Sequence, residues 1–174
     1  YPSTGADLKG LIKSAYYDPN PCVILEHKGL YWSKIKGTED AKTVEPDEDY
    51  VIPFGKARMV QTAEASLNPP IGGKRVSTLT VITYGMGVYW AKNAAKKFSS
   101  PNGGEPALSL SKGQEGARIE IIDLRTLVPL DEKTVFESVK KHSRCLVVTE
   151  EPVQNSFAQA LAGLISEKCF ESLD

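Results

Sequence analysis

The chain has 174 residues, 41% of them hydrophobic and 25% charged, which is enough for one complete hydrophobic core. Its formal net charge of −1 excludes an overall field that would draw it to nucleic acid or to an anionic membrane. No apolar stretch approaches the roughly 20 residues that span a bilayer, and the polar opening Tyr1–Thr4 is unlike a signal peptide. We expect a cytoplasmic protein, and we expect both ends to be cut from a longer one.

The three cysteines, Cys22, Cys145 and Cys169, are widely spaced and lie in apolar surroundings. This pattern predicts buried thiols in a reducing compartment, because a metal site or a disulfide framework would need clustered cysteines.

Residues 4–17 are predicted to form a helix that Thr4 caps. Helical spacing predicts a buried stripe on it, made of Leu8, Leu11, Ile12 and Ala15. The two prolines of Asp18–Pro21 end the helix, and the apolar run Cys22–Glu26 is predicted to be a short buried strand. These elements form one αβ unit without the elements needed to cover it.

The polar segment 27–49 ends in the acidic run Glu45–Asp49, which is typical of an exposed linker. We therefore divide the chain into a first domain fragment with its linker, residues 1–49, and a second domain, residues 50–174. Tyr50–Gln61 is predicted to be a strand at a sheet edge, since it contains a proline, and Asn68–Lys74 is predicted to be a turn in a hairpin.

From residue 78 onward, apolar runs alternate with helical patterns. Predicted strands are 78–84, 118–124 and 145–149, and predicted helices are 88–98, 132–142 and 156–170. A Ser-, Gly- and Pro-rich insertion at 99–116 interrupts them. This βαβαβα order predicts a three-layer α/β/α sandwich around a mainly parallel sheet.

Two charged side chains lie at the carboxyl end of the second of these strands. Asp123 and Arg125 follow the apolar run, at the edge where open α/β sheets place functional groups. Pro129 ends the extended segment, and Asp131 is a natural N-cap for the next helix.

Several other residues could carry chemistry, and most have a plainer explanation. The turn Gly85–Gly87 opens a helix and could hold a phosphate, but position 90 is Trp90 rather than the third glycine of a dinucleotide fingerprint. Glu150 and Glu151 follow the last strand, where they could cap the next helix or line an interface. His142 ends a helix, which stabilises a cation, and His27 could line a cleft. The residues alone provide no complete catalytic set.

The order of these segments resembles a known family. Leu8–Ala15, Asp18–Pro21 and Val23–Glu26 are similar to the end of the pyrimidine-binding domain in beta subunits of 2-oxo acid dehydrogenases. Ile52–Ala57 resembles the arm that leads into their C-terminal domain. Elements of that domain are matched in turn by Thr83–Gly87, Ile121–Asp131, Glu137–Lys141 and Thr149–Glu151. The sequence of Asn155–Gln159 is similar to that of a bacterial form in which the alpha and beta parts are joined in one chain.

The resemblance implies a transketolase C-terminal domain with a five-stranded, mainly parallel sheet. The full-length oxidoreductase, of the pyruvate or branched-chain type, would bind thiamin diphosphate and Mg²⁺, decarboxylate a 2-oxo acid and acylate a lipoyl group. The resemblance places the activating glutamate and the catalytic histidine before Tyr1, and the diphosphate and Mg²⁺ ligands in the alpha part. We therefore assign no catalytic, cofactor or metal residue here, and expect neither bound cofactor nor activity from this part alone.

The implied role of this part is assembly, without contact to nucleic acid or membrane. Its partners would be an alpha-type domain or subunit, a second beta-type copy and the dihydrolipoyl acyltransferase core. Asp174 matches an aspartate near the family's docking surface for that core, and Glu150 and Glu151 are further partner-site candidates. Asn155–Ser156 stands where the family has two glycines, which departs from its interface pattern.

Two alternatives remain open. One is another transketolase-superfamily enzyme, against which Arg125–Asp131 and Ile52–Gly55 favour the dehydrogenase. The other is a stand-alone flavodoxin-like module that binds a nucleotide at Gly85–Gly87. The substrate, the oligomeric state and the role of the insertions near 62–77 and 99–117 are not determined by the sequence.

Overall fold

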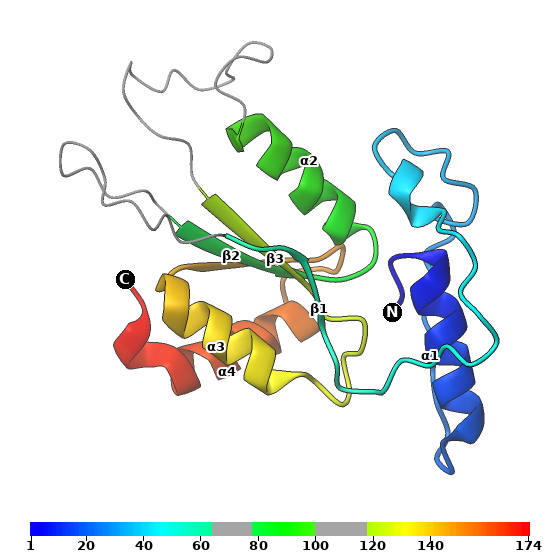
Figure 1. The fold of residues 1–174 in the computed structure, drawn as a ribbon. Helices are drawn as coiled ribbons and strands as arrows, with labels where there is room; N and C mark the ends of the chain where they lie inside the picture. The colour runs from blue at the N-terminus through cyan, green and yellow to red at the C-terminus, as the bar shows by residue number, and fades with distance from the viewer. Residues whose placement is uncertain (64–77, 100–117) are drawn as a thin grey trace.

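A computed structural model describes residues 1–63, 78–99 and 118–174. Figure 1 shows a sheet with helices on both faces and, beside one end of it, an N-terminal unit that contains α1 (Gly5–Tyr17). The predicted α/β class and layered arrangement are confirmed. The hairpin turn 68–74 and the insertion proposed at 99–116 fall outside the described residues, apart from Ser99.

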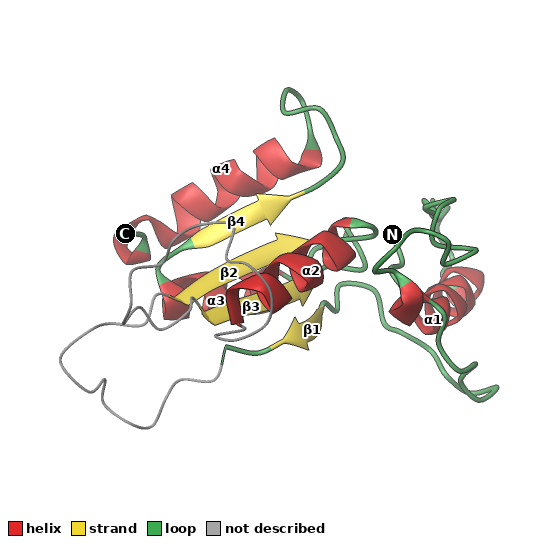
Figure 2. Cartoon of the chain, turned by 90° about the horizontal axis from the view of Figure 1, so that it is seen from above, coloured by secondary structure: helices red, strands yellow, loops and turns green. Residues whose placement is uncertain are grey.

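Three parallel strands form the centre of the sheet: β2 (Thr78–Thr83), β3 (Arg118–Asp123) and β4 (Cys145–Val148). A fourth, β1 (Arg58–Gln61), pairs antiparallel with β3, so the order is β1-β3-β2-β4 (Figure 2). The mainly parallel sheet is as predicted, but it has four strands among the described residues rather than five. In this part of the chain no strand pairs with the outer edge of β4.

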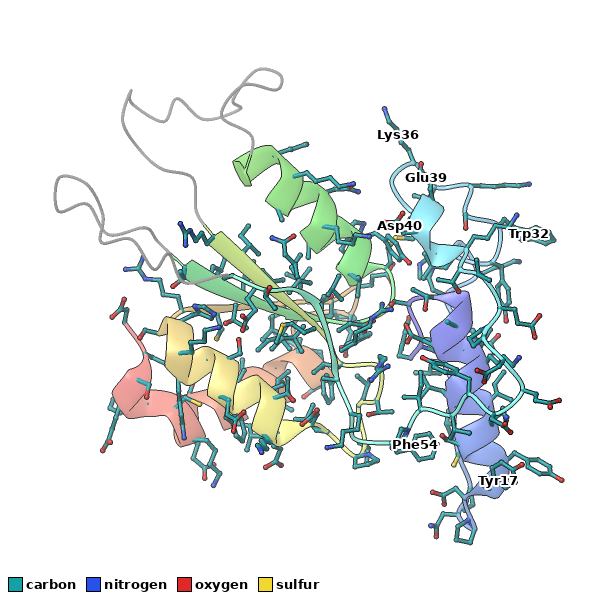
Figure 3. All side chains as sticks on the ribbon, viewed as in Figure 1. Tyr17, Trp32, Lys36, Glu39, Asp40 and Phe54 are labelled. Atoms are coloured by element: carbon teal, nitrogen blue, oxygen red, sulfur yellow. The ribbon has the colours of Figure 1, made fainter. Side chains whose placement is uncertain are left out.

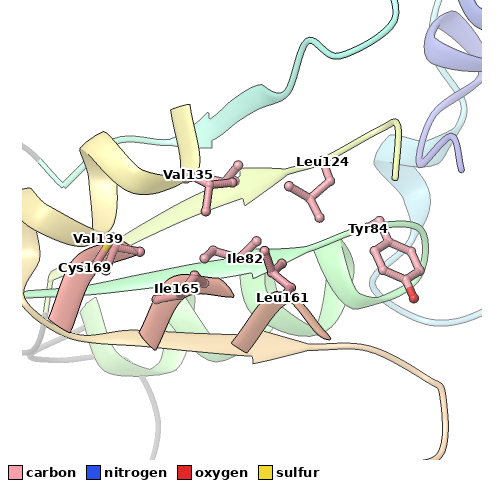
Figure 4. Close-up of a cluster of buried hydrophobic side chains, with 9 residues drawn as sticks. Ile82, Tyr84, Leu124, Val135, Val139, Leu161, Ile165 and Cys169 are labelled. Carbon is pink, nitrogen blue, oxygen red and sulfur yellow. The ribbon is translucent and has the colours of Figure 1, made fainter. Parts of the chain in front are cut away.

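Residues of β2 and β3 alternate between two apolar layers, as the strand period requires. On one face, Val81, Ile119 and Ile121 pack against Ala91 and Ala95 of α2 (Gly87–Ser99). On the other, Ile82 and Ile122 pack against α3 (Glu132–His142) and α4 (Phe157–Cys169) (Figure 4). The side chains that these two helices bury include Val135, Val139, Leu161 and Ile165.

The helix ends agree closely with the sequence. Thr4, Asp131 and Ser156 each accept a hydrogen bond from the backbone three residues on, so each is the N-cap of its helix. Two short 3₁₀ helices complete the described elements: η1 (Glu39–Ala41) and η2 (Phe170–Ser172). None of the helices in the described ranges is both long enough and apolar enough to cross a membrane.

The first 60 residues account for the main errors. Cys22–Glu26 is not a strand, because no described segment pairs with it, and Val23 and Leu25 are exposed. For the same reason Cys22 is an exposed thiol rather than a buried one. Cys145 is only half-buried, Cys169 is buried as predicted, and all three cysteines are free. In α1, Leu11 is buried as predicted but Ile12 is exposed. The predicted strand at 50–61 is reduced to β1, and the residues before it form an irregular arm.

The N-terminal unit is attached to this arm and to the sheet. The Ile52 amide donates to the Gly10 carbonyl (3.3 Å), and the buried Ser3 and Asp7 side chains reach the end of β3. The division of the chain after residue 49 stays a prediction.

Candidate functional site

The candidate site lies at the carboxyl end of the parallel strands, where the N-terminal unit meets the sheet (Figure 1). At this edge the aromatic rings of Tyr1 and Tyr84 pack with their centroids 4.7 Å apart, and Phe157 adds an edge contact to Tyr84. The site therefore combines the N-terminal residue and the start of α4 with the loops that follow β2, β3 and β4.

A cluster of charged and polar side chains lies at the end of β3. We call it the carboxyl-edge cluster, and it consists of Ser3, Asp7, Arg58, Asp123 and Arg125. Arg58 contacts Asp7 Oδ2 through Nη1 (3.2 Å) and Asp123 Oδ2 through Nη2 (3.0 Å). The Ser3 hydroxyl donates to Asp123 Oδ2 at 2.5 Å. Each group thus has a polar partner within the chain, as burial of a charge requires.

Asp123 has no exposed surface, and desolvation raises the pKa of its carboxyl from 3.8 to about 6. The Arg58 charge and the Ser3 hydrogen bond act in the opposite direction on this pKa, while the nearby Asp7 charge adds to the increase. A carboxyl of this kind could transfer protons near neutral pH, but its oxygens are already used by Ser3, Arg58 and the Arg125 amide.

Arg125 fastens the arm to this edge. Its guanidinium donates to the Lys56 and Ala57 carbonyls at 3.0 and 3.3 Å and contacts Asp7 Oδ1 at 3.4 Å. Its backbone adopts a left-handed conformation with φ of 57°. The structure therefore places Asp123 and Arg125 at the predicted edge, but both are engaged in internal contacts.

The two glutamates after β4 have different environments. Glu151 accepts from the Tyr84 hydroxyl, and its second oxygen accepts from the Phe157 amide at 2.8 Å, at the start of α4. Burial and the Glu151 carboxylate raise the pKa of Tyr84 well above its ordinary value. Glu150 instead contacts His27 Nε2 at 3.2 Å, a pair that sequence reasoning missed because 123 residues separate the two.

Asp174 lies at the amino end of β4, on the side of the sheet opposite the candidate site. Its carboxylate contacts Arg144 Nε at 3.2 Å, and its amide donates to the Ser143 carbonyl. The side chain of Asp174 stays largely exposed, which a docking residue requires. The structure does not bring Asp174 into contact with Glu150 or Glu151.

The turn Gly85–Gly87 has a packing role. Gly85 has φ of 54°, and a Cβ there would lie 2.5 Å from the Tyr1 ring. The amides of Gly87, Val88 and Tyr89 donate to carbonyls within the turn. Since these three N–H groups are already used, they are not free to bind a phosphate at the start of α2.

Among the described residues, two of the cavities lie beside the N-terminal unit. One, of about 540 Å³, lies between segment 20–25 and the loop 125–129, and most of its lining is apolar. The second, of about 200 Å³, lies between the start of α1 and segment 26–31, and His27 contributes to its wall. His27 thus lines a cleft, which was one of the roles considered for it from the sequence.

The described residues provide no cluster of side chains for the Mg²⁺ of a thiamin diphosphate site. Within residues 1–63, 78–99 and 118–174, no three His, Cys, Asp or Glu side chains gather so that they could hold a metal ion. We therefore derive no chemical step through that cofactor.

Comparison with known proteins agrees with this fold. Residues 106–174 match the family model of the transketolase C-terminal domain. A 2-oxoisovalerate dehydrogenase subunit beta from Bacillus subtilis is 34% identical over 173 residues, 99% of this chain and 42% of that protein.

Two further relatives have different names. A pyruvate dehydrogenase E1 component subunit beta from Rhizobium meliloti is 34% identical over 173 residues, 99% of this chain and 30% of that protein. An acetoin:2,6-dichlorophenolindophenol oxidoreductase subunit beta from Cupriavidus necator is 35% identical over 172 residues, 99% of this chain and 40% of that protein. The chain spans less than half the length of these curated relatives.

The resemblance predicted from the sequence agrees with these matches: residues 106–174 match the family model of the transketolase C-terminal domain, and nearly the whole chain is similar to beta subunits of 2-oxo acid dehydrogenases.

Proposed function

We propose that the chain is the C-terminal part of the decarboxylating component of a 2-oxo acid dehydrogenase complex. The observation that carries this proposal is the extent of the similarity, which covers 99% of the chain. It therefore includes the N-terminal unit as well as the sheet, and the carboxyl-edge cluster joins these two parts. In the full-length enzyme a 2-oxo acid would be oxidatively decarboxylated and a lipoyl group acylated.

The role of this part would be assembly. Its buried charges are paired with one another, so we assign it no catalytic residue, and thiamin diphosphate with Mg²⁺ would be held by other parts of the enzyme. The proposed partners are an alpha-type domain or subunit, a second beta-type copy and the dihydrolipoyl acyltransferase core. Asp174 and Glu150 support the last of these, since both keep carboxylate surface exposed. We place the enzyme in the cytoplasm, which the three free cysteines support.

Glu151 contributes differently to this proposal. Its two oxygens are occupied by Tyr84 and by the first turn of α4, so it shapes the loop that presents Glu150 rather than meeting a partner itself.

The test is a turnover assay of the complete protein with its alpha-type partner, thiamin diphosphate and Mg²⁺. Reduction of 2,6-dichlorophenolindophenol is followed with pyruvate, 2-oxoisovalerate or acetoin as substrate. Turnover of either 2-oxo acid supports the proposal and identifies the substrate type. Turnover of acetoin alone would assign the chain to the activity named for the Cupriavidus necator relative. Transfer of a two-carbon unit between sugar phosphates, with no 2-oxo acid turnover, would favour another transketolase-superfamily enzyme.

A further inference from the structure

Residues 27–38, which we call the basic aromatic loop, form an ordered surface feature of the N-terminal unit. Backbone hydrogen bonds join Leu30 to His27, Ser33 to Leu30 and Thr38 to Ile35, at 2.9 to 3.2 Å. The loop is anchored at both ends. Leu30 packs against the buried Met86, Val88 and Tyr89, and Gly37 packs closely on Asn93 of α2. The loop is therefore held in one shape before any partner binds.

This anchored loop presents large apolar side chains to solvent. The exposed fraction is 71% for Trp32, 56% for Tyr31 and 44% for Ile35. Trp32 points outward from the molecule in Figure 3. Exposed tryptophan and tyrosine on a preorganised loop are typical of binding surfaces, because such side chains bury a large area at little entropic cost.

The same loop carries unmatched positive charge. Lys28, Lys34 and Lys36 are exposed, and none has an ion-pair partner among the residues that the structure describes. Lys34 Nζ lies 5.6 Å from the centre of the Trp32 ring, which joins the charge to the aromatic surface. Residues 27–38 contain no acid.

Three acids near the loop have other partners. Asp40 pairs with Lys92 of α2, and Glu39 accepts a hydrogen bond from the Gly37 amide. Glu45, farther along, pairs with Lys9 of α1. The lysines of the basic aromatic loop thus have no ion-pair partner among the described residues, although Glu26 and Glu39 lie beside the loop in the sequence.

We infer that the basic aromatic loop binds an acidic segment of a partner protein that also carries apolar side chains. The three lysines would pair with its carboxylates, while Trp32, Tyr31 and Ile35 would contact its apolar groups. A protein is favoured over nucleic acid because the chain as a whole carries a net charge of −1 and Ile35 provides apolar rather than stacking surface. This inference goes beyond the proposed function and does not depend on 2-oxo acid chemistry.

The test uses the complete protein and a fluorescein-labelled peptide of alternating glutamate and leucine, (Glu-Leu)₄, followed by fluorescence anisotropy. We expect binding that weakens with added salt and that falls by at least about tenfold in Trp32→Ala and in Lys34→Glu/Lys36→Glu. Lys133→Glu/Lys168→Glu makes the same charge change on α3 and α4 and should leave the affinity within about twofold. Because all four lysines are exposed, the thermal unfolding temperature should change little in either double variant.

Four results would overturn the inference. They are absence of binding, equal loss of affinity in the control variant, equally tight binding of (Lys-Leu)₄, and tighter binding of single-stranded DNA or phosphatidylserine vesicles. A fifth check compares acrylamide quenching of tryptophan fluorescence in the complete protein and in its Trp32→Phe variant, whose difference reports Trp32. Protection of Trp32 in the complete protein would show that the protein itself already covers the loop, which would also contradict the inference.

Discussion

The Arg58 guanidinium lies 3.0 Å from the Asp123 carboxylate and holds Asp7 through its other terminal nitrogen, so one cation joins the sheet to the N-terminal unit. Both carboxylates are fully or almost fully buried. Burying these charges costs desolvation energy, which their mutual attraction offsets. Substituting one member of the cluster therefore measures how much the cluster affects the unfolding free energy.

The first prediction concerns the effect of pH on Asp123. Its folded-state pKa of about 6 lies above the ordinary 3.8, so its stabilising effect is complete below about pH 4 and is lost as the pH rises through 6. A shift of this size corresponds to about 3 kcal/mol. Asp123→Asn should remove this dependence of the unfolding free energy on pH. The unfolding free energy of the wild type should therefore fall relative to that of the variant as the pH rises from 4 to 7. Urea titrations at several pH values measure it.

The matched control is Asp47→Asn, since Asp47 is exposed. A wild-type curve that stays parallel to that of Asp123→Asn across this pH range would contradict the raised pKa.

The second prediction concerns Arg58. Arg58→Met leaves Asp7 and Asp123 in a buried site with one fewer cation, so we expect a loss of about 3–5 kcal/mol in unfolding free energy. Adding Asp123→Asn to Arg58→Met should recover part of this loss, because it removes one uncompensated charge. Arg144→Met, which breaks the exposed contact to Asp174, should cost less than about 1 kcal/mol. Equal effects of the two arginine substitutions in denaturant titration would be inconsistent with the buried cluster.

The third prediction separates the two glutamates. Glu151→Ala removes the carboxylate that accepts from the Phe157 amide and from Tyr84, and should cost about 1–2 kcal/mol. Glu150→Ala should cost less than about 1 kcal/mol, since its contact to His27 is partly exposed. If Glu150 also faces the acyltransferase core, Glu150→Ala should bind the core more weakly in a calorimetric titration, while its thermal unfolding temperature stays unchanged. Equal thermal destabilisation by both variants would refute this division of roles.

The fourth prediction compares two glycines. Gly163 lies in α4 with open space where a Cβ would stand, so Gly163→Ala should raise the unfolding free energy by about 0.5–1 kcal/mol. Gly85→Ala should lower it by about 1–3 kcal/mol, because φ is positive and the new Cβ would meet the Tyr1 ring. Thermal melts of the two variants should therefore shift in opposite directions, and a shift in the same direction would contradict the described turn.

The elements that were predicted well have local causes. The helix bounds at 132–142 agree because Asp131 caps the helix in the sequence and in the structure alike. The failure at Cys22–Glu26 has a different cause, since an apolar run becomes a strand only when a neighbour pairs with its backbone. The contacts Arg58–Asp123 and His27–Glu150 join residues far apart in the chain, and no pattern in one sequence indicates which distant charges will meet.

The last prediction tests whether the described turn can bind a nucleotide. The amides at Gly87, Val88 and Tyr89 are paired within the turn, and the Tyr1 ring packs against Gly85, so both features oppose the binding of a diphosphate here. Calorimetric titration of the 174-residue chain with thiamin diphosphate plus Mg²⁺, with flavin and with nucleotides should therefore give no binding heat. Gly85→Ala serves as a control, because it changes the turn and should leave the result unchanged. Micromolar binding of a flavin or nucleotide would favour the stand-alone binding module, whereas tight thiamin diphosphate binding would place the cofactor site within this chain.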